Sequence, residues 1–194
     1  MVRIAQEEMS SKEYAMRKRY GRWIILVLLA SAGLRVPGYA AEEGTVKATS
    51  AWQGQGRFFQ VGKDQAFFVG SFEGVMYVET KEGALDAAKI ICPGTVDLNL
   101  KTGTQSGQGH CVITAANGDQ VFASWNCTGT HTTVGCAGRF TLMDGTGRFT
   151  GIVGNGDFQF RSSLSEYATT LGNGSVQATS GGLATWPALT YRIP

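Results

Sequence analysis

The chain has 194 residues, 16% of them charged, and a formal net charge of +2. An average soluble domain is roughly 25% charged, and so small a net charge does not favour a nucleic-acid partner. A hydrophobic content of 43% argues against wholesale disorder, and only 4 prolines exclude a collagen-like or proline-rich chain. What remains is one glycine-rich globular domain preceded by a segment of different composition.

The N-terminal segment has the composition of a secretory signal peptide. Residues 23–34 read WIILVLLASAGL, an apolar run of 12 residues, whereas a membrane-spanning helix needs about 20. Small residues follow at Ala40 and Ala41, and we expect cleavage after one of them. Translation from Met16 would give a more compact signal. An uncleaved anchor is the alternative, which the short run disfavours. The basic residues before the run are Arg17, Lys18, Arg19 and Arg22.

We therefore expect a signal peptide at 1–41 and a single mature domain at 42–194, located in the periplasm or secreted. The signal carries 7 basic and 3 acidic residues, so the remaining 10 basic and 12 acidic residues give the mature domain a net charge of −2. This balance removes the last support for nucleic-acid binding. We expect no stable membrane span.

The mature sequence is typical of an all-β protein. Short runs rich in β-branched and aromatic residues are separated by Gly, Asn and Asp, as in the turns at 117–119, 144–147 and 172–174. Alternation is clearest at 119–127, where Val121 and Trp125 share one face. So many short strands predict one barrel or one sandwich, and the glycines favour a single antiparallel barrel of about eight strands. The predicted strands are 45–52, 55–61, 65–80, 88–92, 95–101, 109–116, 119–127, 133–142, 155–163, 165–171, 174–180 and 183–192.

All four cysteines lie in the mature domain, which predicts two disulfides with three conceivable pairings. Cys127 and Cys136 fall opposite each other if the chain turns back around 131–132. Cys92 and Cys111 fall nearly opposite across a turn at 101–104, so we predict the pairs 92–111 and 127–136. The spacings contain no C-x₂₋₄-C pair, which argues against a structural zinc site.

The most specific stretch is DGTGRFTGIVGNGDF at 144–158. Its glycines predict a tight turn that Phe149 and Ile152 anchor in the core. A dinucleotide fingerprint would need a helix after the glycines, and β-like sequence follows instead. The segment resembles the glycine-rich hairpin of the allene oxide cyclase-like and dirigent-like β-barrels. The resemblance implies an eight-stranded antiparallel barrel with a central cavity, often in a homo-oligomer; members include an isomerase that cyclises a fatty-acid epoxide and proteins that steer radical coupling.

Five side chains are candidates for ligand binding. Glu73 and Tyr77 share one face of the strand at 65–80, and His110 precedes a cysteine on another strand. Trp125 belongs to the aromatic set, and Asp157 lies in the glycine-rich hairpin. Each also has a structural interpretation, as a solvated strand face or as core packing. No nucleophile elbow or metal-binding helix motif is present, so hydrolysis is not supported and no catalytic residue is assigned.

The leading hypothesis is a non-enzymatic exported barrel, stabilised by disulfides, that binds a small apolar ligand or a protein partner. An isomerase or cyclase acting on an oxidised lipid-like substrate is the alternative from another class. A third hypothesis is a structural or inhibitory protein that acts through its surface loops. We expect no cofactor and no metal.

Overall fold

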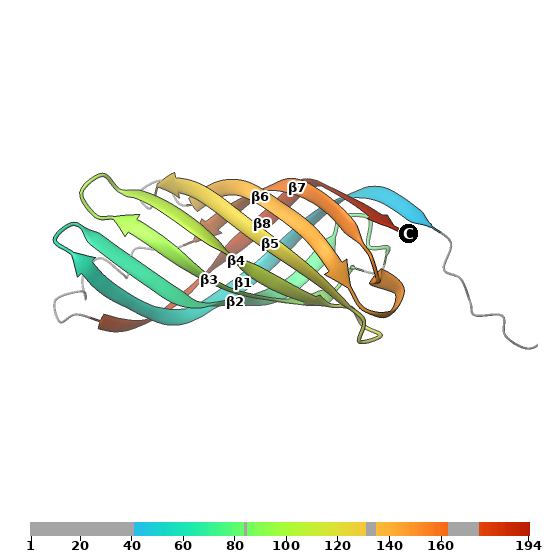
Figure 1. Ribbon diagram of the computed structural model, residues 1–194, viewed down its shortest axis with the longest axis horizontal. Helices are drawn as coiled ribbons and strands as arrows, with labels where there is room; N and C mark the ends of the chain where they lie inside the picture. The colour runs from blue at the N-terminus through green and yellow to red at the C-terminus, as the bar shows by residue number, and fades with distance from the viewer. Residues whose placement is uncertain (1–40, 84, 131–134, 163–174) are drawn as a thin grey trace, which may run out of the picture. The chain divides into compact units, whose positions relative to one another are not determined.

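The computed structural model describes residues 41–83, 85–130, 135–162 and 175–194. These residues form an all-β structure whose eight antiparallel strands close into one barrel in sequence order, as predicted (Figure 1). The closing pair joins the first and last strands, from Glu42 opposite Ile193 to Phe59 opposite Ser175. The strands are β1 (Glu42–Gly62), β2 (Gln65–Val78), β3 (Ala88–Asn99), β4 (Thr104–Thr114), β5 (Gln120–Thr130), β6 (Gly135–Gly145), β7 (Val153–Ser162) and β8 (Ser175–Ile193).

Strand boundaries differ from the prediction because glycine and proline do not break these strands. The segments 45–52 and 55–61 are one strand, β1, and 174–180 and 183–192 are likewise combined in β8. The predicted break at Pro93-Gly94 lies inside β3. The predicted strand at 165–171 and the turn at 131–132 lie outside the described residues.

Four glycines on neighbouring strands form a row across the barrel wall. Gly56 of β1 pairs with Gly70 of β2, which pairs with Gly94 of β3, which pairs with Gly109 of β4. A methyl group at any of these four positions would collide with a neighbouring strand's backbone and with an aromatic ring. The ring of Trp125 occupies the space over the last two glycines. Glycine is therefore needed here for packing, within strands rather than at turns.

One end of the barrel is closed by the DGTGRFTG turn and by the short 3₁₀ helix η1 (Gly147–Phe149) that it contains. Phe149 and Ile152 are buried in the core, as the sequence predicted. The carboxylate of Asp144 accepts hydrogen bonds from the backbone N–H groups of Gly145 and Gly151, at 2.8 and 2.9 Å. These bonds lower the pKa of Asp144, the one from Gly151 most strongly. We call this the η1 end. At the opposite end lie the β1–β2 and β3–β4 connections (Figure 1).

Candidate functional site

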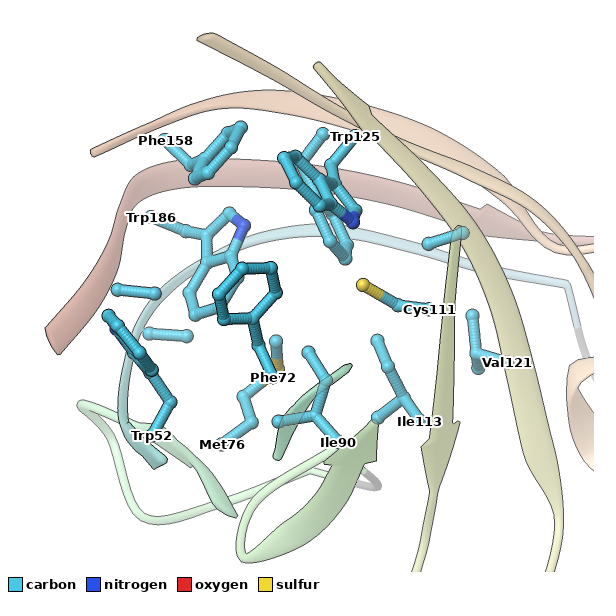
Figure 2. Close-up of a cluster of buried hydrophobic side chains, with 14 of the residues drawn as sticks. Trp52, Phe72, Met76, Ile90, Cys111, Ile113, Val121, Trp125, Phe158 and Trp186 are labelled. Carbon is cyan, nitrogen blue, oxygen red and sulfur yellow. The ribbon is translucent and has the colours of Figure 1, made fainter. Parts of the chain in front are cut away.

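The barrel interior is filled by an aromatic cluster centred on Phe72 of β2. Figure 2 shows this ring between Trp52 and Trp125, with Trp186 beside it. The Phe72 ring centroid is 5.4 Å from that of Trp52, 5.9 Å from that of Trp125 and 5.2 Å from that of Phe160. Most of these contacts are edge-to-face, the arrangement that aromatic pairs favour. The cluster therefore packs as a protein core does.

In the described part of the chain, two cavities adjoin this cluster, each with a volume of about 40 Å³. Trp52, Phe72, Trp125 and Phe160 line both cavities, so these four rings form the partition between them. The first cavity lies toward the end that carries the β3–β4 connection, where Gln105 lines it. The second lies deeper, in contact with Trp186. A cavity of this size accommodates about one water molecule, whereas benzene occupies one of about 150 Å³.

Three indole N–H groups of the interior are fully buried without a hydrogen-bond partner. They belong to Trp52, Trp125 and Trp186, whose rings line the cavities. Buried tryptophan usually finds an acceptor for its N–H, because a buried donor without one costs about 1–3 kcal/mol. An acceptor atom could reach one of these donors only if its ring moved, because the nitrogens themselves have almost no accessible surface.

Both predicted disulfides are present, and each lines one cavity. Cys92–Cys111 joins β3 to β4 beside the deeper cavity, with the two Cα atoms 4.1 Å apart. Cys127–Cys136 joins β5 to β6 beside the first cavity. The second pair is diagonal rather than directly opposite, because Cys127 pairs with Gly138 and Cys136 with Gly129. The pairing was predicted correctly, whereas the register was wrong by two residues.

Of the five predicted ligand-binding residues, only Trp125 points into the barrel. Glu73 and Tyr77 lie on the outer face, since they alternate with the buried Phe72 and Met76 on β2; Tyr77 is 55% exposed. His110 is also exposed, because the next residue on β4 faces inward. The structure does not bring these side chains together at one site.

Asp157 also lies on the outer face, where it forms an exposed ion pair with Arg139 at 2.8 Å. Its neighbour Phe158 is the residue of β7 that packs into the interior. Alternate residues of a strand face opposite sides of the sheet. The outward orientation of these four residues could therefore have been predicted from the apolar residues beside them in the sequence.

Sequence reasoning missed the polar residues of the first cavity. Gln105 on β4, Ser162 on β7 and Ser180 on β8 line it together with the aromatic rings. Gln105 is 9% exposed and Ser162 is 5% exposed. Gln105 alternates with polar residues on a strand rich in glycine, so hydrophobic alternation does not mark it as inward-facing.

The interior site is electrically neutral. Within the described part of the chain, no Asp, Glu, Lys, Arg or His is buried, and neither cavity is lined by an ionisable side chain other than cysteines held in disulfides. A cyclase in this interior would have to work with hydroxyl, amide and indole groups alone.

The described residues contain no cluster of three potential metal ligands. They also contain no helix that is long and apolar enough to cross a membrane.

Comparison with protein families, curated proteins and solved structures found no match to this chain.

Proposed function

We propose that this protein is an exported, disulfide-stabilised β-barrel that binds one small, uncharged and largely apolar molecule in its interior. The observation that carries the proposal is the pair of aromatic-lined cavities, in whose walls three indole N–H groups are buried without an acceptor. Aromatic walls with a few convergent polar groups are typical of small-molecule sites. A ligand that moves one of these rings on binding would offer its indole N–H a carbonyl, ether or hydroxyl oxygen.

The size of the cavities defines how such a ligand binds. Each cavity alone holds only one or two heavy atoms, but both share the same four-ring partition. A rotation of one partition ring would join the two cavities into one longer site. The ligand would therefore be narrow, or would displace a ring such as Phe72 on binding.

Export is the second part of the proposal. The apolar run at 23–34 and the basic residues before it support a signal peptide, and β1 begins at Glu42, directly after the expected cleavage position. Two disulfides support an oxidising compartment, the periplasm or the exterior. The closed eight-stranded barrel also supports kinship with the allene oxide cyclase-like barrels, for which a homo-oligomer remains a prediction.

Native mass spectrometry of protein exported by its own signal tests the proposal. We expect a mass that begins at residue 41 or 42, about 4 Da below that of the reduced chain because two disulfides have formed, and a retained small molecule. Replacing Trp125 by Phe removes one indole N–H while keeping an aromatic ring, and should weaken ligand retention. A ligand-free spectrum, together with no stabilisation by any member of a panel of small uncharged molecules, would refute interior binding.

A further inference from the structure

We propose that the interior site has a polar end at Gln105, Ser162 and Ser180, so that its ligand carries an uncharged polar group at one end of an apolar body. This inference rests on the proposed interior binding and specifies its ligand class. The ligand would lie with its polar group in the first cavity and its apolar body toward the second.

Gln105 is the residue that points to a ligand. Its side chain is nine-tenths buried and lines the first cavity, and its amide has no hydrogen-bond partner among the residues that the structure describes. Its neighbours across β3 and β5 are Leu98 and Gly129, which offer no side-chain partner. The amide is not among the fully buried unpaired polar atoms, so it keeps some accessible surface and is free to bond to a molecule that enters the cavity. A ligand that supplies both a donor and an acceptor would satisfy it.

Two serine hydroxyls face the same cavity from the opposite wall. Ser162 lies on β7 and Ser180 on β8, whereas Gln105 lies on β4, four strands from β8 in a barrel of eight. A polar group placed between these walls could bond to the amide on one side and to a hydroxyl on the other. An alcohol or a primary amide has this combination of donor and acceptor.

The absence of charge in the described interior selects a neutral ligand. A carboxylate or an ammonium group placed beside Gln105 would be buried with no counter-ion within the described residues. Burying an unpaired charge costs far more than burying a neutral group that is hydrogen-bonded.

The deeper cavity defines the other end of the ligand. Apart from the hydroxyl of Ser50, which bonds to the carbonyl of Ala51, and the indole N–H groups, its wall is apolar. Ile90, Phe140 and Phe158 contribute to this wall together with the Cys92–Cys111 disulfide. A narrow alkyl chain would extend into it with displacement of a partition ring, so the gradient from polar to apolar along the barrel fixes the orientation of the ligand.

The test uses three probes on the mature protein: xenon, 1-hexanol and hexanoate. Xenon reports whether the apolar cavities bind anything, and the other two differ only in the polar end. We expect xenon and 1-hexanol to bind and hexanoate to bind at least 100-fold more weakly. Binding of hexanoate as tightly as 1-hexanol would overturn the polar-end inference. Binding of xenon without binding of 1-hexanol would also overturn the polar-end inference, but it would agree with binding in the interior. If none of the three probes bound, both the polar-end inference and the proposed interior binding would be refuted.

A matched pair of variants locates the polar end. Gln105→Leu removes the amide at nearly constant volume, and Gln108→Leu makes the same change on the outer face of the same strand. We expect Gln105→Leu to weaken 1-hexanol binding about tenfold, which corresponds to about 1.4 kcal/mol, and to leave xenon binding unchanged. Gln108→Leu should change neither. Equal 1-hexanol affinity in the two variants would overturn the assignment of Gln105.

Discussion

Replacement of Phe72 by Ala should both destabilise the barrel and open its interior. The Phe72 ring touches the rings of Trp52, Phe68, Trp125 and Phe160 at centroid distances between 5.2 and 5.9 Å. A buried Phe→Ala change costs about 3–5 kcal/mol, and four aromatic contacts place this one in the upper part of that range. For a domain of this size, we expect a fall in melting temperature of roughly 10–15 °C.

The same substitution should create a site for a benzene-sized molecule. Phe72 lines both cavities, so its removal joins them and adds the volume of the ring. An apolar cavity of about 150 Å³ binds benzene. Benzene at 100 times its dissociation constant would then restore about 2.7 kcal/mol of stability to the variant.

Thermal unfolding with and without benzene measures both effects, with Phe67→Ala as the control. Phe67 lies five residues before Phe72 on the same strand, β2, but is half-buried on the outer face. Its truncation should cost less, and benzene should not stabilise that variant. A loss below about 1 kcal/mol in Phe72→Ala would refute the packing described for this ring. If Phe72→Ala lost the expected 3–5 kcal/mol but benzene did not stabilise it, the claim that the Phe72 ring separates the two cavities would be wrong.

Three further predictions concern the wall of the barrel. Gly94→Ala should cost about 1–3 kcal/mol in urea unfolding, because the added methyl meets the ring of Trp125, whereas Gly62→Ala, which makes only ordinary contacts, should be neutral. Replacing the two cysteines of one disulfide by Ser should lower the free energy of unfolding by about 3.2 kcal/mol for the β3–β4 disulfide and by about 2.6 kcal/mol for the β5–β6 disulfide. The first loss is larger because its disulfide closes a longer loop, with a sequence separation of 19 against 9. Equal losses would contradict this chain-entropy argument. Because the pKa of Asp144 is lowered from its ordinary value of 3.8, its carboxylate should stabilise the fold above pH 3.8, and this stability should be lost as the pH falls through the lower folded-state pKa. The free energy of unfolding, measured from pH 2 to 6, should therefore depend less steeply on pH in Asp144→Ala.

The cysteine pairing and the barrel class could be predicted because their signals are local. Two cysteines that flank one turn come together whenever that turn forms, and the alternation around Trp125 shows its inward face directly. The turn at 144–151 could also be predicted, because Phe149 and Ile152 are large apolar residues between glycines.

The residues that face the interior could be predicted only in part, because the hypothesis followed chemical type instead of strand parity. Glu73 was singled out as a carboxylate, although Phe72 beside it marks the opposite face as interior. Gln105 was missed because one polar residue on a glycine-rich strand carries no hydrophobic period. The fusion of predicted strands at Gly54 and Gly94 depends on rings from elsewhere in the chain, which no local pattern shows.

The pairing of β1 with β8 has a consequence for the order in which the protein acquires its structure. As the chain is synthesised from its N-terminus, β1 emerges first, and the strand that completes its hydrogen bonding emerges last. One edge of β1 therefore stays open until almost the whole domain is available, and an open edge is a template for pairing with other chains. The two disulfides connect hairpins formed from nearby residues and can form before closure. Oxidation would thus shorten the interval in which the unfinished sheet is vulnerable to aggregation, a contribution that an equilibrium measurement of stability does not capture.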